Sequence, residues 1–320
     1  MTKRNTNTQL ALPGTSDLVP NLQSFVHASK AKNTQRAYKA AWDDFKDWCQ
    51  RFNCIPLPAS VATLAHYLVL QSDINTVATL NVRLAAISFA HTTAHQLDPT
   101  DTIEVKTVMS GLRRKLGTAP NKKAPILRDD LAQMVSGLPD TLAGKRDKAI
   151  LLLGFAGAFR RSELVALDVK HVVVLDDQVV ITLPRSKTDQ EGKSAKKHVP
   201  RMGGDLCPVA ALQVWLSAAG IRSGPVFRKV DRWGKVGQLR MNAGTIAQIV
   251  KTAAKAAGLN PNVVSGHSLR SGFITSAAGR DVAEWKIQQV SQHKSTEVLR
   301  GYIQDSGQGA MDAVRTVLED

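Results

Sequence analysis

The sequence has few cysteines and no apolar run long enough to cross a bilayer, which argues against two broad classes of protein. Its three cysteines, Cys49, Cys54 and Cys207, form no metal-binding spacing and cannot all pair, unlike those of a disulfide-bonded secreted domain. Residues 1–21 are polar and contain no apolar signal core. No stretch reaches the roughly 20 apolar residues that a membrane helix needs. We therefore expect a reduced, cytoplasmic protein with no membrane partner.

The sequence also lacks the motifs of common metal- and nucleotide-dependent enzymes. It contains no HExxH, no Cys-x-x-Cys pair and no glycine-rich loop that ends in lysine. Asp-Asp pairs stand at 129–130 and 176–177, but the second is typical of a turn and no third carboxylate completes a two-metal site. We expect no metal ion and no cofactor.

Positive charge is what the chain has in excess. Its 42 Lys and Arg outnumber 27 Asp and Glu, which gives a formal charge of +15 at pH 7. A surface of this sign attracts a polyanion over long range and binds it with an affinity that depends on salt. A merely solvated basic surface is the plain alternative, but this charge favours nucleic-acid binding.

The first half of the chain has a helical pattern. Residues 1–17 are polar and we expect them to be flexible, whereas residues 18–116 are expected to form a helical domain. Its clearest helix begins at Asn33 and Thr34, and Tyr38, Trp42 and Phe45 follow at spacings of three and four. Further helices are expected over 58–71, 75–95 and 101–116.

The second half, residues 126–320, mixes helices with a few strands. After a linker at 117–125, helices are expected over 129–136 and 146–158. Two β-branched runs, 171–175 and 178–183, then flank Asp176 and Asp177 and indicate a hairpin. Residues 197–200 could add a third strand, and helices are expected from Pro208 onward. The fold class is thus mainly α with a small antiparallel β-sheet.

Two basic clusters could hold a phosphodiester. Charge that develops on phosphate oxygens in the absence of a metal must be neutralised by fixed cations, and the planar guanidinium suits this because it pairs two oxygens at once. Arg160 is followed three residues later by Glu163, which can orient it. His267 and Arg270 share a face at a helix start, where the dipole adds positive potential. A structural Arg–Glu pair and a packed histidine are the alternatives.

Three further residues complete a candidate reaction centre. Tyr302 is one of only three tyrosines, and nearby cations and a base would lower the barrier to its use as a nucleophile. His293 precedes it by nine residues. Lys187 follows the second strand and could protonate a leaving oxygen. An ordinary packing tyrosine and a solvated basic loop are the alternatives, since Arg185, Lys193, Lys196 and Lys197 are nearby.

Taken in order, these residues resemble the tyrosine recombinase (phage integrase) family, most closely its compact Cre- and Xer-type members. The resemblance implies strand cleavage through a 3′-phosphotyrosyl intermediate. It implies the following roles: Arg160 and Arg270 as phosphate clamps, Glu163 and His267 as supporting acid/base groups, Lys187 as general acid, His293 as phosphate hydrogen-bond donor, and Tyr302 as nucleophile. The family commonly has glycine where this chain has Gln292, a departure that we expect to affect local packing.

The family's layout also implies how the chain meets its partners. It implies a helical core-DNA-binding domain and a catalytic domain that clamp a duplex, and an action on the nucleoid. Residues 308–319 carry Ala310, Val314, Val317 and Leu318 on one stripe, which the family uses for tail exchange in a homo-tetramer on two DNA sites. A tail folded on its own domain is the alternative. We expect no room for a separate arm-site domain at the N-terminus. Side chains expected to contact DNA are Arg36, Lys39, Arg83, Lys122, Lys123 and Arg185.

Two other functions stay open on the sequence alone. A non-catalytic DNA-binding protein, such as a regulator or a decayed integrase, would share the charge, and a type IB topoisomerase-like enzyme would share the chemistry. Lys122 and Lys123 could follow a phosphate backbone or simply lie in a solvated hinge. If His267 accepts a proton, we expect cleavage to slow in mildly acidic solution, where an ordinary histidine becomes protonated.

Overall fold

The computed structural model describes residues 32–118, 122–184, 195–293, 295–301 and 318. The chain divides into two compact units, Met1–Asn121 and Lys122–Asp320. The expected linker at 117–125 is therefore shared, because its last residues belong to the second unit. There the Ala124 amide donates to the Val263 carbonyl at 2.7 Å, and the Ile126 amide to Ser268 at 3.0 Å.

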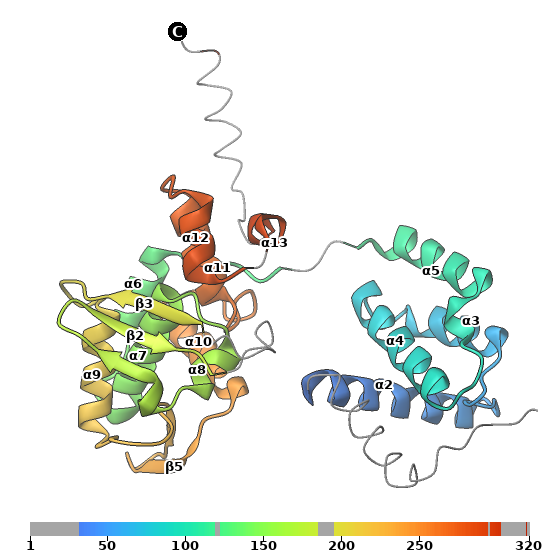
Figure 1. Ribbon diagram of the computed structural model, residues 1–320, viewed down its shortest axis with the longest axis horizontal. Helices are drawn as coiled ribbons and strands as arrows, with labels where there is room; N and C mark the ends of the chain where they lie inside the picture. The colour runs from blue at the N-terminus through green and yellow to red at the C-terminus, as the bar shows by residue number, and fades with distance from the viewer. Residues whose placement is uncertain (1–31, 119–121, 185–194, 294, 302–317, 319–320) are drawn as a thin grey trace, which may run out of the picture. The chain divides into compact units, whose positions relative to one another are not determined.

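The first unit is helical over its described residues (Figure 1). Side-chain caps define two of its helix starts: Ser60 Oγ accepts from the Thr63 amide, and Thr76 Oγ1 accepts from the Thr79 amide. Its elements are α2 (Lys32–Arg51), α3 (Val61–Gln71), α4 (Val77–Thr93), the short 3₁₀ helix η2 (Pro99–Asp101) and α5 (Ile103–Leu116).

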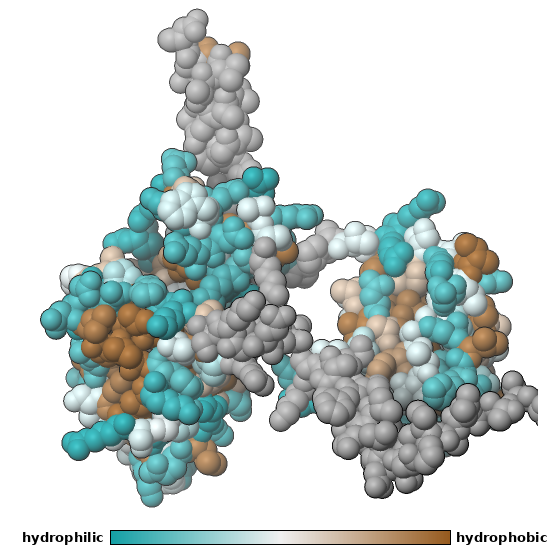
Figure 2. Space-filling model, in the orientation of Figure 1, coloured by the Kyte–Doolittle hydropathy of each residue, from teal (hydrophilic) through white to brown (hydrophobic). Residues whose placement is uncertain are grey.

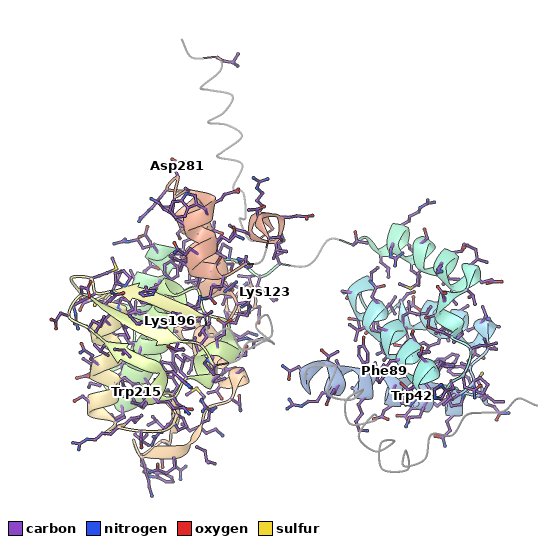
Figure 3. All side chains as sticks on the ribbon, viewed as in Figure 1. Trp42, Phe89, Lys123, Lys196, Trp215 and Asp281 are labelled. Atoms are coloured by element: carbon purple, nitrogen blue, oxygen red, sulfur yellow. The ribbon has the colours of Figure 1, made fainter. Side chains whose placement is uncertain are left out.

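A core of aromatic and aliphatic side chains holds these helices together. Phe45 of α2 is fully buried and meets Tyr67 of α3 edge-on, with 4.9 Å between ring centroids. Asp44 of α2 accepts hydrogen bonds from the Tyr67 hydroxyl, at 2.7 Å, and from Arg83 of α4. One carboxylate thus joins three helices. Trp42 and Phe89, labelled in Figure 3, belong to the same unit.

The second unit contains helices and two small antiparallel sheets. Its helices are α6 (Arg128–Ser136), α7 (Leu142–Ala156), α8 (Arg161–Ala166), η3 (Val169–His171), α9 (Pro208–Ala218), α10 (Ala243–Ala256), α11 (Ser268–Ala278), α12 (Glu284–Ser291) and α13 (Thr296–Arg300). Its strands are β1 (Val172–Val174), β2 (Gln178–Thr182), β3 (Lys196–Pro200), β4 (Arg228–Val230) and β5 (Val236–Arg240).

The three-stranded sheet has the order β1-β2-β3, and the expected hairpin through Asp176 and Asp177 is confirmed. Val173 lies opposite Val180, which in turn lies opposite His198 of β3. This row is on the outer face, and Figure 2 shows apolar surface over the sheet. The alternate residues, including Ile181, point inward, because side chains on a strand alternate between faces.

The second sheet, β4–β5, was not expected, because only helices were predicted after Pro208. Arg228 pairs with Arg240, and Val230 with Val236. Charged and glycine residues dominate this hairpin, so it lacks the β-branched runs by which strands are recognised. The fold class is nevertheless confirmed: the described chain is mainly helical with small antiparallel sheets. None of its described helices combines the length and the apolar character that crossing a membrane requires.

Candidate active site

Arg160 and Glu163 lie at the start of α8 and are tied to each other twice. Glu163 accepts from the Arg160 backbone amide at 2.9 Å and from its guanidinium at 2.6 Å. The Glu163 side chain is 5% exposed and that of Arg160 is 26% exposed. The carboxylate therefore fixes both the backbone and the side chain of Arg160, while part of that side chain stays exposed.

A tight turn places Arg160 immediately after α7. Ala158 has φ of 45°, a left-handed conformation that favours glycine. A Cβ atom on Gly157 would lie 2.2 Å from the Phe159 ring, so only glycine fits there. The turn therefore depends on specific small residues, and its Ala158 carbonyl accepts from Arg270 at 2.6 Å.

His267 and Arg270 are both held by α11, which begins directly after the histidine. His267 occupies the N-cap position and is half-buried, and Arg270 is fully buried. Gly272 lets α11 approach the chain at Ile126, since a Cβ there would lie 1.8 Å from the Ile126 carbonyl oxygen. This close contact sets the depth at which the Arg270 guanidinium is held.

His293 follows α12 and completes the cluster. Arg270 Nη2 lies 2.9 Å from His293 Nε2, and Ser291 Oγ lies 2.9 Å from Nδ1. Because a guanidinium only donates, Nε2 accepts and Nδ1 carries the proton. Gln288 also donates to the His293 carbonyl at 2.8 Å. A phosphate contact from Nε2 would therefore require the anion to displace the Arg270–His293 bond.

The residue before His293 shows what the departure from glycine does. Gln292 ends α12 with φ of 56°, in the left-handed region, where glycine is the usual residue. Its side-chain amide donates to the Lys196 carbonyl of β3 at 3.3 Å. The glutamine thus accepts an unfavourable backbone conformation and makes a contact that glycine could not make.

Both imidazoles are neutral in this environment. Burial lowers the pKa of His267 to about 4, helped by the positive charges of Arg270 and Arg160. Burial and the same two arginines lower the pKa of His293 to about 3. Slower cleavage in mildly acidic solution is therefore no longer expected of His267, because in the free protein it loses its neutral form only near pH 4. The fall in cleavage rate on the acid side is therefore expected at a lower pH, near 4.

Lys197, which the sequence analysis placed at the start of a possible third strand and gave no catalytic role, lies inside the cluster. Lys197 of β3 is 3% exposed, and its Nζ donates to the carbonyls of Gly157 at 2.7 Å and Val290 at 2.6 Å. Burial lowers its pKa to about 7, with Glu163 opposing and Arg270 assisting the shift. The sequence contained a signal for this position. In a strand over 197–200 the apolar Val199 would face the core, and alternation places Lys197 on the same face, as the structure shows.

The structure brings together five of the seven residues predicted for catalysis. Arg160, Glu163, His267, Arg270 and His293 lie in one cluster, joined by the bonds and charge interactions above. Lys187 and Tyr302 lie outside the described residues, as does Arg185. Within the described ranges, no three His, Cys, Asp or Glu side chains gather as metal ligands.

The other residues expected to contact DNA have varied surroundings. Arg36 and Lys39 are exposed on α2, and Lys39 pairs with Asp43 at 2.7 Å. Lys122 and Lys123 are exposed, and Lys123 donates to the Asn262 carbonyl at 2.8 Å. The Arg83 side chain is only 14% exposed, and its contacts within the first unit give it a structural role there. Contact with DNA stays a prediction for all of them.

Comparison with known proteins identifies the family. A profile described as "Phage integrase family" matches residues 126–308. The chain is 38% identical over 281 residues to an integrase/recombinase XerD homolog of Selenomonas ruminantium, covering 86% of this chain and 82% of that protein. It is 27% identical over 297 residues to the tyrosine recombinase slr0733 of Synechocystis sp. (strain ATCC 27184 / PCC 6803 / Kazusa), covering 88% and 89%.

Solved structures show the same fold at low identity. The Tn1549 transposon integrase in complex with transposon right end DNA matches with a TM-score of 0.62 at 16% identity, over 93% of this chain and 98% of that one. A lambda integrase dimer bound to a COC′ core site matches with a TM-score of 0.59 at 16% identity, over 91% and 95%. This chain belongs to the phage integrase family and is a tyrosine site-specific recombinase.

Proposed function

We propose that this protein cuts and rejoins duplex DNA at specific sites through a covalent 3′-phosphotyrosyl intermediate, without a metal ion or ATP. The observation that carries the proposal is the cluster of Arg160, Glu163, His267, Arg270 and His293. It combines two guanidinium groups with two neutral imidazoles. Fixed cations stabilise charge on non-bridging oxygens, and a neutral imidazole can take up a proton, so the set suits phosphoryl transfer.

In the proposed cleavage step, the Tyr302 oxygen attacks the scissile phosphorus and the bond to the 5′ oxygen breaks. Arg160 and Arg270 hold the non-bridging oxygens, and Glu163 keeps Arg160 oriented. His267 takes up the tyrosyl proton, and Lys187 donates a proton to the leaving 5′ oxygen. Once the phosphate has replaced His293 beside Arg270, His293 donates a hydrogen bond to it from Nε2; this requires the ring proton to move from Nδ1 to Nε2, with Ser291 then donating to Nδ1.

The same groups in reverse rejoin the strand. A 5′ hydroxyl attacks the phosphotyrosine, and the phenol leaves with a proton. The covalent bond conserves the energy of the broken phosphodiester, so no nucleotide is consumed. Action on nucleoid DNA in the cytoplasm follows from this substrate.

We propose further that a homo-tetramer assembles on two DNA sites through exchange of the C-terminal tail. Residues 308–319 have an apolar stripe in the sequence. The second unit has an apolar cavity of about 450 Å³ that could accept a segment of this kind. Residues from α6, α7 and α11 and the end of α12 line it, among them Leu131, Leu152, Phe155, Phe273, Ala277 and Val290. A head-to-tail contact of this type makes a ring when the rotation between protomers closes, and the proposed tetramer is such a ring.

A trapping experiment tests the cleavage proposal. The protein is incubated with a pool of nicked duplexes, some from the DNA that flanks the gene and some of random sequence, so that a cut strand loses a short fragment and cannot be rejoined. We expect a DNA adduct that survives denaturant and is absent with Tyr302→Phe. Binding without any adduct would support a non-catalytic DNA-binding protein instead. Relaxation of supercoils without sequence preference or synapsis would support a topoisomerase-like enzyme.

A further inference from the structure

One buried ammonium group connects two segments of the candidate site. The Lys197 Nζ donates to the Gly157 carbonyl at 2.7 Å and to the Val290 carbonyl at 2.6 Å. Gly157 is the C-cap of α7, and Val290 lies in the last turn of α12. The last carbonyls of a helix lack partners within the helix and carry partial negative charge. Lys197 therefore satisfies the C-terminal ends of two helices at once.

These two helix ends precede two of the phosphate-binding candidates. The chain leaves α7 through Gly157 and reaches Arg160 three residues later. Val290, in the last turn of α12, precedes His293 by the same three residues. A second contact joins the same strand to the second segment, since Gln292 donates to the Lys196 carbonyl at 3.3 Å. The position of β3 thus sets the spacing between the two segments.

We propose that Lys197 is a positioning residue that fixes Arg160 and His293 relative to each other by joining the C-terminal ends of α7 and α12. This inference rests on the strand-cleavage function proposed above. Lys197 is not assigned a contact with substrate. It acts on the reaction through the carbonyls that it binds and through the segments that carry them.

The surroundings of Lys197 favour a positioning role over a contribution to general stability. Its Nζ lies 5.0 Å from the centre of the Phe159 ring, and its neighbours on the inner face of the sheet are apolar. Burial there disfavours the charged form, as the lowered pKa indicates. Among the described residues, Glu163 opposes this shift, and Arg270 and Arg160 add to it. An apolar side chain of similar length would avoid that desolvation cost but could not hold the two carbonyls.

The test compares Lys197→Met, Lys197→Arg and a neighbouring control, Lys196→Met, whose side chain is exposed on the same strand (Figure 3). The probe is the duplex recovered from the trapping experiment. Three quantities are measured for each variant: the melting temperature, the dissociation constant for the duplex, and the single-turnover rate of adduct formation at saturating protein. Imidazole resonances of the free proteins report the environment of His293 independently of DNA cleavage.

We expect Lys197→Met to slow adduct formation about tenfold or more while duplex affinity changes less than about threefold, because the defect lies in the chemical step. Lys197→Arg should recover most of the rate, since a guanidinium also donates to two carbonyls. Lys196→Met should cleave at nearly the native rate. The His293 resonances should shift in Lys197→Met and stay in place in Lys196→Met.

A native rate in Lys197→Met, or a loss of rate matched by an equal loss of duplex affinity and of the folded state, would overturn the inference. If Lys197→Met does not fold, the arginine variant decides: a folded Lys197→Arg that cleaves as slowly as a catalytic knockout contradicts the positioning role. Failure of the native protein to form any adduct would instead count against the proposed function, and the resonance measurement would still test the contact.

Discussion

At the scale of single residues, the site combines fixed positive charge with neutral bases. Arg160 and Arg270 lie close enough to His267 and His293 to lower the pKa of both imidazoles, and burial lowers them further. Such a site attracts an anion and keeps unprotonated nitrogen available at neutral pH. Among the described residues, Glu163 is the acid that balances these charges, so its substitution should have a clear effect.

Glu163→Gln should lower the cleavage rate by about tenfold to a hundredfold, because loss of a charged hydrogen-bond partner for a guanidinium costs about 1.5–3 kcal/mol. The Arg160 side chain would keep its charge but lose the carboxylate that orients it. Single-turnover adduct formation measures the effect. Asp205→Asn is the matched control, since the Asp205 side chain is wholly exposed; similar losses in both variants would remove Glu163 from the site.

The lowered pKa values also predict how stability depends on pH. The imidazoles of His267 and His293 have folded-state pKa values of about 4 and about 3, below their ordinary value of 6.5. Between pH 6.5 and pH 4 the histidines bind more protons in the unfolded chain than in the folded protein. The free energy of unfolding should therefore fall as pH falls from 6.5 toward 4. Each imidazole accounts for up to about 3 kcal/mol of this loss of stability.

Urea denaturation at a series of pH values measures this slope. The double variant His267→Gln/His293→Gln should lose most of it between pH 6.5 and 4. An unchanged slope in that variant would show that the two imidazoles are not buried as described.

At the scale of elements, the helices and the first hairpin could be predicted from the sequence, and the second hairpin could not. Apolar spacing and capping residues locate α2 through α7, and β-branched runs around Asp176 locate β1 and β2. β4 and β5 carry too many charges to show such a pattern. Seven catalytic candidates were predicted from residue type and order, and five of them lie among the described residues. The Lys197 contacts could not be predicted in this way, because they join segments that are distant in the chain.

The contact between α11 and Ile126 gives a prediction with an unusual sign. In a helix interior Gly→Ala normally adds about 0.5–1 kcal/mol of stability. At Gly272 the new Cβ would meet the Ile126 carbonyl oxygen at 1.8 Å, so we expect Gly272→Ala to lose about 2 kcal/mol or more and to slow cleavage by displacing Arg270. Gly111→Ala on α5 is the control, because nothing lies within 4 Å of its Cβ.

Thermal or urea unfolding measures both glycine variants. The control should be at least as stable as the native protein. A stable, fully active Gly272→Ala would contradict the close approach that places Arg270 in the site.

At the scale of the whole molecule, two compact units and a formal charge of +15 suit binding to an extended polyanion. Binding through many phosphate contacts releases counterions, so affinity should fall steeply as salt rises. In the proposed ring, copies of the chain bind each other on DNA through the C-terminal segment 308–319.

A chain shortened to end at residue 307 should bind and cleave a single site but fail to join two sites. Removal of 308–320 takes away the apolar stripe that we place in the cavity of a neighbouring protomer. Native-gel or light-scattering analysis of complexes with two labelled duplexes measures synapsis. The variant Phe273→Asp, on the acceptor side, should show the same defect if it folds as judged by its melting temperature. Normal synapsis by the shortened chain would rule out tail exchange.

The most direct test of the central claim is to identify the residue bound to DNA in the trapped adduct. The adduct is digested with protease and nuclease, and the peptide that retains a nucleotide is sequenced by mass spectrometry. We predict that the peptide contains Tyr302 and that its phenolic oxygen carries the 3′-phosphate of the cut strand. A nucleotide on any other side chain, or a 5′-phosphate linkage, would contradict the proposed mechanism.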